Sequence, residues 1–365
     1  MHYRKDLRIF VRECRSLARA GYQVHYVVAD GQGDELLEGI HIHDVGLRRP
    51  LPWRFIETHA AIKAKAVELA ADLYHFHDPE LMRMGLQLKG NGAKVIADVH
   101  EDVPKEMLGN TKKSWPRRQL SAFAVDRLEQ FILPKLDAVI TPTPILEARL
   151  ASASRRIQTI GCFPDLEGEF PAQPILDTQA ADKPYDLVYI GSIGPLRGLI
   201  ENVQALAGTS WTYALLGDFQ GGVAQQLFEL PAWKTNVSYL GFTQERTKVL
   251  EVLGKARIGM ATLLPHPNYA TAYCLKVFEY MAMGLAVITS DFPFWQALID
   301  ECQCGLTVDS TDVKAIQSAV DYLLTHPAEA QQMGRNGRRA IEQKYNWATQ
   351  EQLLLNLYYQ LLGPP

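Results

Sequence analysis

Short apolar runs alternate with segments of helical period along almost the whole chain, and the alternation is interrupted once. In the first half the apolar runs are YQVHYVVAD (22–30), DLYHFHD (72–78), KVIADVHED (94–102) and LDAVITPT (136–143). Each run is short and is closed by polar residues or proline, as buried parallel strands are. Helical period appears between them at 59–71, 79–92 and 118–136. The alternation predicts a doubly wound α/β domain.

The interruption is a stretch rich in proline and acidic residues, 163–184, which is typical of a linker. The alternation then restarts with strand candidates at 185–192, 211–218, 237–242, 257–264, 285–290 and 305–309. Two such blocks in 365 residues predict two doubly wound, Rossmann-like α/β domains that face a cleft. We expect an N-terminal domain over 1–165, a linker over 166–184, a C-terminal domain over 185–343 and a final helix over 344–365. Five apolar residues of that helix fall near one face and predict that it packs on a domain surface: Trp347, Leu354, Leu357, Tyr358 and Leu361.

The beginning of the chain is a crossover helix followed by a strand, with Asp6 as the expected N-cap. A first strand and a glycine-rich turn should precede that helix, and in doubly wound sheets the first strand is usually central. Only five residues precede Asp6 here. We expect that residues before Met1 are missing, with an N-terminal sheet that lacks its first strand as the alternative.

Composition narrows the class of protein. The net charge of −4 gives no general case for nucleic-acid binding. No apolar run approaches the roughly 20 residues that span a bilayer, and the basic N-terminus lacks the features of a secretory signal. Five cysteines without paired spacing suit a reducing cytoplasm, and Cys302 and Cys304 are expected to be packing residues rather than part of a metal site.

Two segments have the pattern of phosphate sites. In VYIGSIGPLRGLIENV (188–203) a strand ends at Gly191 and Arg197-Gly198 opens a helix. Free N–H groups at a helix start attract anions and an arginine beside them can bind phosphate, although an ordinary turn with a surface arginine has the same pattern.

The second segment is TAYCLKVFEYMAMGLAVITSDFP (271–293), in which the turn 271–275 precedes a helix. Lys276 lies in the first turn, where a cation opposes the helix dipole unless an anion is bound or the side chain reaches solvent. Glu279 follows among apolar neighbours. A carboxylate can accept two hydroxyl groups, as a ribose diol requires, and the alternative is a solvated glutamate.

The histidines mark the ends of two strands. His75 and His77 lie two residues apart in YHFHDPEL, with Asp78 beyond them, and His100 is followed by Glu101 and Asp102. A metal site would suit the first pair, but the two side chains are expected at different depths of a buried strand and no third ligand has diagnostic spacing. We therefore expect no metal site, and we take His100 as a candidate for hydrogen bonding or proton chemistry in the cleft.

A basic segment with one aromatic residue, NTKKSWPRRQL, contains Lys112, Lys113, Trp115, Arg117 and Arg118. It suits an anionic membrane surface or a phosphorylated lipid. A solvated loop with a packed tryptophan fits it equally well. The chain has no G-x-G-x-x-G after a first strand, so dinucleotide oxidoreductases lose support. It also has no G-x-x-x-x-G-K-[ST], no G-x-S-x-G, and no D-x-D motif that might hold a divalent metal on a nucleotide diphosphate.

Taken in series, these segments resemble retaining glycosyltransferases of the GT-B fold, family four. DLRIFVRECRSLARAGYQVHYVVAD, HFHDPEL, VIADVHEDVP, LDAVITPTP, YIGSIGPLRG, LLGD, YLGF, KVFEYMAMGLAVITSDFP and CGLTVD occur in the order of that family, and FEYMAMG is the most specific of them. The chain most resembles the bacterial members that build O-antigen, capsule and other exopolysaccharides. The resemblance implies a nucleotide-diphospho-sugar donor on the C-terminal domain, an acceptor mainly on the N-terminal domain, retention of configuration and no metal. It implies no further cofactor and does not decide whether the nucleotide of the donor is UDP or GDP. It also implies that the final helix packs back on the N-terminal domain.

The resemblance also assigns roles to residues. Its G-R-L-x-x-x-K-G turn matches Gly191 to Gly198, with Arg197 in place of the lysine and Ser192 in place of the arginine. The second glutamate of its E-x7-E pair matches Glu279, whereas the first falls on Thr271. His100 matches a histidine that reaches the donor sugar, so His100, Arg197 and Glu279 are the expected catalytic residues. The full expected donor site is Gly191, Ser192, Arg197, Gly217, Phe242, Thr271, Ala272, Tyr273, Cys274, Leu275, Lys276 and Glu279.

Three functions follow from these features. The first is a hexosyl-transferring enzyme that acts on a glycan or lipid-linked acceptor in surface polysaccharide synthesis, in the cytoplasm and peripherally on the inner face of the plasma membrane. The second is a sugar-nucleotide epimerase, which shares the fold and would turn over the donor without an acceptor. The third is a non-catalytic sugar-nucleotide-binding partner subunit, which Ser192, Thr271 and the missing first strand favour.

Overall fold

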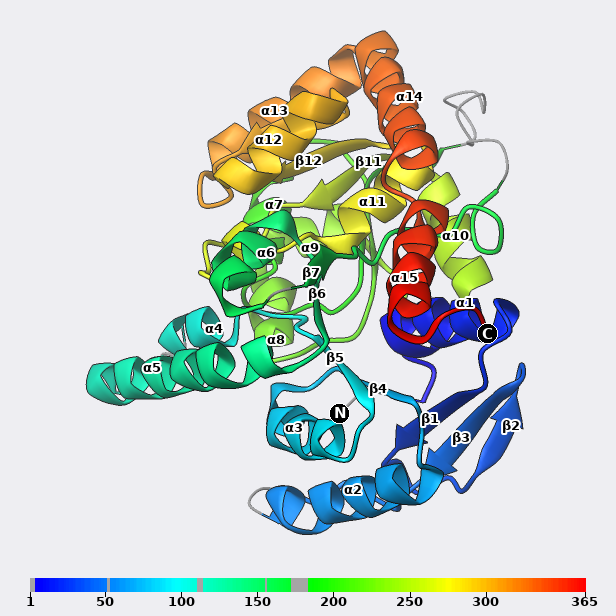
Figure 1. Ribbon diagram of the computed structural model, residues 1–365. Coiled ribbons are helices and arrows are strands. Elements are labelled where there is room, and N and C mark those ends of the chain that lie inside the picture. Colours follow the sequence, from blue (N-terminus) through cyan, green and yellow to red (C-terminus); the bar gives the residue numbers. More distant parts are fainter. Residues whose placement is uncertain (1–3, 51–52, 110–113, 155, 172–182) are drawn as a thin grey trace. The chain divides into compact units, whose positions relative to one another are not determined.

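The computed structural model describes residues 4–50, 53–109, 114–154, 156–171 and 183–365 (Figure 1). The chain divides into two compact units. Unit 1 comprises Met1–Cys162 and Trp347–Pro365, and unit 2 comprises Phe163–Asn346. Both units are built from helices and largely parallel sheets, which confirms the predicted α/β fold class.

Unit 1 contains two separate sheets, ordered β1-β3-β2 and β4-β5-β6-β7. Their strands are β1 (Val24–Val28), β2 (Glu35–Leu37), β3 (Ile40–Asp44), β4 (Leu73–Phe76), β5 (Lys94–Asp98), β6 (Ala138–Thr141) and β7 (Ile157–Thr159). The pairing is parallel except between β2 and β3, which form an antiparallel hairpin. The two residues between them, Glu38 and Gly39, have φ angles of 52° and 80°, the backbone that a two-residue hairpin turn needs.

The two sheets of unit 1 are not joined by backbone hydrogen bonds among the described residues. β1 pairs with β3 alone and β4 pairs with β5 alone. The unpaired edges of β1 and β4 line one cavity of about 430 Å³.

Three helices of unit 1 overlap the predicted segments 59–71, 79–92 and 118–136, whereas those at Val103–Gly109 and Pro144–Leu150 were not predicted. The chain is helical from Leu7 to Cys14, with π-type hydrogen bonding, and continues as α1. Asp6 is the N-cap, as predicted, since its carboxylate accepts the N–H groups of Arg8 and Ile9. The other helices are α2 (Glu57–Leu69), α3 (Met82–Gly90), α4 (Val103–Gly109), α5 (Trp115–Ile132), α6 (Pro144–Leu150) and α15 (Trp347–Leu362), and α1 is Arg15–Arg19. Short 3-10 turns lie at Trp53–Phe55, Pro79–Leu81, Leu133–Lys135 and Ala151–Ala153.

Helix α15 belongs to unit 1 although it ends the chain. Its buried residues are Trp347, Leu354, Leu357 and Tyr358, which pack in one cluster with Leu17 of α1 and Ile96 of β5. The Trp347 indole N–H also donates to the Ser16 hydroxyl at 3.0 Å. No helix in the described part of the chain is both long enough and apolar enough to cross a membrane.

Unit 2 is built on one six-stranded parallel sheet. Its strands are β8 (Tyr185–Ile190), β9 (Tyr213–Leu216), β10 (Val237–Tyr239), β11 (Ala256–Ala261), β12 (Ala286–Ser290) and β13 (Gly305–Val308). Five of the six lie within the predicted segments, and β11 begins one residue before its segment. Side chains alternate along β8: Val188 and Ile190 enter one hydrophobic cluster, whereas Leu187 and Tyr189 enter another. The sheet is therefore covered on both faces, as continuous apolar runs require.

The helices of unit 2 connect these strands. They are α7 (Leu199–Ala205), α8 (Val223–Glu229), α9 (Pro231–Asn236), α10 (Arg246–Gly254), α11 (Leu275–Ala282), α12 (Pro293–Cys302), α13 (Val313–Thr325) and α14 (Pro327–Gln343), with a 3-10 turn at Tyr269–Thr271. The strand order is β10-β9-β8-β11-β12-β13. Chain order therefore reverses between β8 and β11, and ligands of such sheets bind beyond the carboxyl ends of the strands at that point.

Candidate functional site in unit 2

The loops after β8 and β11 meet at the point where the strand order reverses. Gly198 ends the turn after β8 with φ of 69°, and a Cβ atom there would lie 1.7 Å from the Thr262 carbonyl oxygen, just after β11. The Leu264 N–H donates to the Leu196 carbonyl at 3.1 Å. Only glycine permits this approach, so the two loops are held together at the reversal point.

Two cations lie beside this loop pair, Arg197 in the turn after β8 and Lys276 in the first turn of α11. The Arg197 guanidinium carbon is 5.2 Å from the centre of the Tyr269 ring, and Lys276 Nζ is 4.8 Å from the centre of the Tyr189 ring. The pKa of Lys276 is raised: burial disfavours its charge, the Cys274 and Tyr189 side chains favour it, and the Arg197 charge opposes it. The two cations are therefore close enough to interact.

Neither cation has a carboxylate partner within the described ranges. Two nearby positive charges repel each other, and an anion between them would remove that repulsion. Lys276 lies beside the end of β8, because its Nζ is 3.9 Å from where a Cβ atom on Gly191 would be. The pair therefore suits a doubly charged anion at the carboxyl end of the central strand.

Helix α11 begins beside this pair. Its N-cap residue, Cys274, makes no side-chain hydrogen bond to the helix, so the first-turn N–H groups have no side-chain cap. The preceding turn is held by the Trp295 indole, which donates to the Ala272 carbonyl at 2.8 Å. An uncapped helix start attracts anions, which adds to the two cations.

Glu279 is the one acidic residue of α11, whose other inward side chains are apolar and buried. Its carboxylate is 18% exposed, and its Oε1 accepts Arg246 Nη1 at 2.5 Å. The Arg246 guanidinium in turn lies 4.6 Å from the centre of the Phe170 ring. One carboxylate oxygen is thus fixed by a cation, while Oε2 makes no hydrogen bond to the described residues.

Arg246 was not predicted from the sequence. It opens α10, after the segment GFTQE, where an arginine has the pattern of a solvated helix start. Nothing in its sequence neighbourhood marks it, because its partner Glu279 lies 33 residues further along the chain.

The remaining predicted donor residues lie at the carboxyl ends of neighbouring strands. The Ser192 carbonyl, after β8, accepts the Tyr189 hydroxyl at 2.7 Å. A Cβ atom on Gly217, after β9, would lie 1.8 Å from the Gly191 carbonyl oxygen, so glycine is required there. Phe242, beyond β10, is 59% exposed, and Thr271 ends the 3-10 turn before α11. Unit 2 therefore brings the predicted donor residues together at one edge of its sheet.

The predicted histidines belong to unit 1. His100 follows β5, and its Nε2 is 3.0 Å from Asp98 Oδ2 and 3.0 Å from His77 Nδ1. The prediction that His75 and His77 lie at different depths is wrong. Their ring centres are 4.5 Å apart and both side chains line the cavity between β1 and β4, because residues two apart on a strand share a face.

In the predicted basic segment, Lys112 and Lys113 lie outside the described residues. Trp115 opens α5 and is 64% exposed, so the alternative of a packed tryptophan is wrong. Arg117 is exposed, whereas Arg118 donates to the Leu108 carbonyl at 3.0 Å.

Two family models match the chain in sequence. Residues 8–167 match "Glycosyltransferase Family 4", and residues 176–340 match "Glycosyl transferases group 1". A curated relative, the D-rhamnosyltransferase WbpZ of Pseudomonas aeruginosa, is 24% identical over 44% of this chain and 42% of its own length. The chain thus matches less than half the length of its curated relatives.

Two solved structures share the fold over most of both chains. The sucrose-phosphate synthase of Thermosynechococcus elongatus has a TM-score of 0.77 and 21% identity, covering 98% of this chain and 94% of the other. The Anabaena protein HepE, solved in complex with UDP-glucose, has a TM-score of 0.65 and 15% identity, covering 88% and 87%. At these identities the likeness concerns the fold.

Proposed function

The chain belongs to glycosyltransferase family 4, with the GT-B fold, and from that premise we propose that it transfers a sugar from a nucleotide-diphospho-sugar with retention of configuration. The observation that supports this most is the Arg197–Lys276 pair beside the uncapped start of α11. Two cations and a helix start at the reversal point suit the diphosphate of such a donor.

Each donor group has a matching residue in this proposal. Arg197 and Lys276 bind the diphosphate and stabilise the negative charge that develops as it leaves, which is often the largest catalytic effect. Glu279 accepts the ribose hydroxyl groups through its second oxygen, and Arg246 holds its first oxygen in place. His100 is proposed to act near the reacting carbon of the donor sugar. The chemistry proposed requires no metal at the diphosphate, because the two cations supply the positive charge.

The donor site is tested by nucleotide binding. Lys276→Gln and Arg197→Gln each remove one cation from the pair, and a charge-assisted hydrogen bond contributes about 1.5–3 kcal/mol, or roughly tenfold to a hundredfold in affinity. UDP-glucose and GDP-mannose titrated by calorimetry would give these values. Lys314→Gln, on the exposed start of α13, is the matched control and should bind as the parent chain does. Unchanged affinity in both site variants would refute the diphosphate role.

Turnover separates the three candidate functions. A transferase consumes the donor only in the presence of an acceptor and forms a new glycosidic bond. An epimerase would consume the donor without an acceptor. Tight donor binding without turnover, over a panel of glycan and lipid-linked acceptors, would instead identify a binding subunit.

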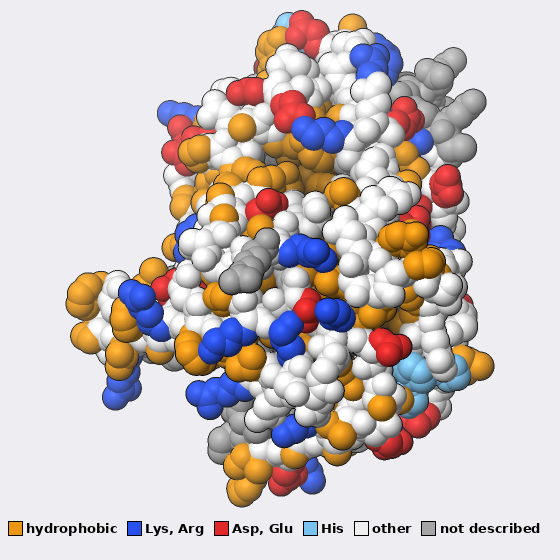
Figure 2. All heavy atoms as spheres, in the orientation of Figure 1, with side chains coloured by type: hydrophobic (Ala, Val, Ile, Leu, Met, Phe, Trp, Pro, Cys, Tyr) orange, Lys and Arg blue, Asp and Glu red, His pale blue; other side chains and the backbone are white. Residues whose placement is uncertain are grey.

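We also propose that the acceptor is a glycan or a lipid-linked glycan of a bacterial surface polysaccharide, and that the enzyme works on the cytoplasmic face of the membrane. Helix α5 supports the membrane contact. Leu120, Phe123 and Phe131 on it are 70%, 56% and 61% exposed. Figure 2 shows hydrophobic and basic side chains gathered where α4 and α5 project. Exposed apolar side chains interleaved with cations suit an anionic lipid surface.

Basic side chains lie close to the rings of Phe123 and Phe131. The Arg127 guanidinium carbon is 4.9 Å from the centre of the Phe123 ring, and Lys135 Nζ is 3.0 Å from that of Phe131. Sedimentation with phosphatidylcholine vesicles, with and without phosphatidylglycerol, tests the contact. The parent chain should sediment with the mixed vesicles, and Phe123→Gln should reduce this strongly. Leu36→Gln, an equally exposed apolar residue on β2, should not. Equal sedimentation of all three chains would refute the role of α5.

A further inference from the structure

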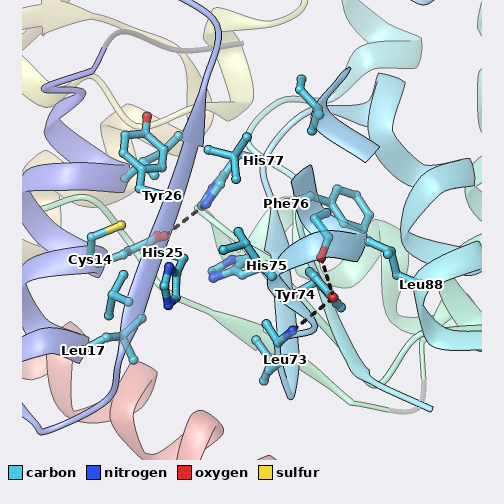
Figure 3. A pocket seen from close by; sticks show the side chains of 18 of the residues that line it. Cys14, Leu17, His25, Tyr26, Leu73, Tyr74, His75, Phe76, His77 and Leu88 are labelled. Atoms are coloured by element: carbon cyan, nitrogen blue, oxygen red, sulfur yellow. Dashed lines mark hydrogen bonds and ion pairs between the residues drawn. The ribbon is translucent and has the colours of Figure 1, made fainter. Parts of the chain in front are cut away.

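Four potential metal ligands converge within unit 1. Glu13 comes from the helical segment Leu7–Cys14, His75 and His77 from β4 and its end, and Asp98 from β5. One ligand atom of each lies within 4.8 Å of the others. Figure 3 shows His75 and His77 extending from β4 into the cavity. Sequence spacing could not reveal this group, because its members come from three separate segments.

These side chains are buried without full hydrogen bonding. The carboxylates of Glu13 and Asp98 are 2% and 0% exposed, and the His75 side chain is 8% exposed. Neither oxygen of Glu13, nor Asp98 Oδ1, nor His75 Nε2 makes a hydrogen bond. A buried polar atom without a partner destabilises the fold, and more so when it is charged. Apart from the ion pair between Glu13 Oε1 and Arg8, these atoms lack a hydrogen-bonding partner, and one cation could be shared by the converging side chains.

The orientation of the two imidazoles suits coordination through Nε2. His75 Nδ1 is 3.0 Å from the Tyr358 hydroxyl, and His77 Nδ1 is 3.3 Å from Asp98 Oδ2. On the other side of each ring, His75 Nε2 is 4.0 Å from Asp98 Oδ2 and His77 Nε2 is 3.6 Å from Glu13 Oε2. A histidine that binds a metal through one nitrogen usually holds a polar partner on the other.

The charges also favour a cation. Arg8 Nε lies 2.8 Å from Asp98 Oδ2 and 3.2 Å from Glu13 Oε1, so one guanidinium is shared between two carboxylates. One guanidinium between two buried carboxylates leaves the charge of the second carboxylate for a further cation to balance.

We propose that unit 1 binds one divalent transition-metal ion, best matched by Zn²⁺, through His75 Nε2, His77 Nε2, Asp98 Oδ1 and the Glu13 carboxylate. Two imidazole nitrogens and two carboxylate oxygens form a four-coordinate set of the kind zinc accepts. Glu13, His75 and His77 line the cavity of about 430 Å³, which gives an ion a path to the site. The ion fixes Asp98, which accepts from His100, so it positions His100 without taking part in sugar transfer.

The full chain, freed of metal by dialysis against a chelator, is titrated with Zn²⁺ in competition with a chromogenic chelator. One equivalent should bind, and His75→Gln and Glu13→Gln should each weaken binding about a hundredfold or more. Tyr358→Phe removes only the hydroxyl that holds His75, keeps the ring buried and should weaken binding about tenfold. Tyr358→Phe therefore still tests the site if His75→Gln or Glu13→Gln fails to fold. Co²⁺ added in place of Zn²⁺ should give visible absorption bands of tetrahedral intensity, which the ligand variants lose.

A second histidine cluster on β1 and β3 provides the control. The rings of His25, His41 and His43 are stacked, with centres 5.0 Å and 5.2 Å from that of His25. Stacked rings direct their nitrogen atoms side by side, and these residues do not belong to the converging group. A double variant, His41→Gln with His43→Gln, should therefore still bind one equivalent of Zn²⁺ as tightly as the parent chain does. Three results would each overturn the proposal. The parent chain could fail to bind Zn²⁺ tightly, the control could lose its tightly bound Zn²⁺, or His75→Gln and Glu13→Gln could both keep it.

Discussion

Gly198→Ala tests whether the contact between the loops after β8 and β11 holds the proposed donor site together. The new Cβ atom would lie 1.7 Å from the Thr262 carbonyl oxygen. A carbon–oxygen contact needs about 3.3 Å, so the loops would have to separate by about 1.6 Å. Forced overpacking costs about 1–3 kcal/mol, and alanine at positive φ costs about 1–2 kcal/mol more. We expect a total loss of about 2–5 kcal/mol.

Gly208→Ala separates these two contributions. Gly208 has φ of 76°, but no atom lies within 4 Å of where its Cβ atom would be. This variant should lose only the backbone contribution of about 1–2 kcal/mol. Urea unfolding followed by circular dichroism would compare the midpoints at an unchanged m value. Nucleotide affinity should also fall in Gly198→Ala, because Arg197 is the preceding residue, and should be unchanged in Gly208→Ala.

Equal destabilisation of the two glycine variants would refute the reasoning. It would mean that the loops after β8 and β11 separate freely. The contact between Gly198 and Thr262 would then not define the position of Arg197.

Three further outcomes are expected. Arg149→Met leaves the fully buried Glu129 carboxylate without the guanidinium that lies 2.7 Å away. The variant should be less stable by about 3–5 kcal/mol in urea unfolding. Adding Glu129→Gln should recover most of this loss. Tyr280→Phe removes the hydroxyl that accepts the Ile190 N–H at 3.2 Å and should cost about 1–2 kcal/mol by the same measurement; no change would show that water replaces it. The pKa of Asp44 is lowered, since four backbone N–H groups favour its charge more than burial opposes it. The folded chain therefore binds this proton less tightly than the unfolded chain, so the stabilisation is present above the ordinary carboxyl pKa and is lost as the pH falls below it. Asp44→Asn should remove the loss of stability at low pH that Asp44 causes. An ordinary pKa for Asp44 in an NMR titration would contradict this prediction.

The strands could be predicted because their side-chain pattern is local. Six runs in the second half become the six strands of unit 2, and the helix that carries Glu279 begins where the turn 271–275 ends. The β2–β3 hairpin was not predicted. Its strands are only 3 and 5 residues long and partly exposed, so they carry little apolar signal.

The partners of the site residues could not be predicted, because they depend on contacts distant in sequence. Arg246 reaches Glu279 across 33 residues, and Arg8 reaches Asp98 across 90. The exposure of Leu120 and Phe123 could not be predicted either, because an apolar helix face usually indicates burial. The sequence led us to expect no metal site at His75 and His77, because only the fold brings Glu13 and Asp98 to them.

The open edges of β1 and β4 have a consequence for how unit 1 unfolds. No backbone ladder joins its two sheets in the described part of the chain, so they are linked through side chains such as Arg8 and Asp98 and through the apolar cluster around α15. Each sheet can therefore open as a cooperative block of its own. Amide hydrogen exchange should be fast along the free edge of β4 and slow in β5 and β6, which have neighbours on both sides. A strand that paired with both β1 and β4 would join the two sheets into one block and would slow amide exchange at both edges together.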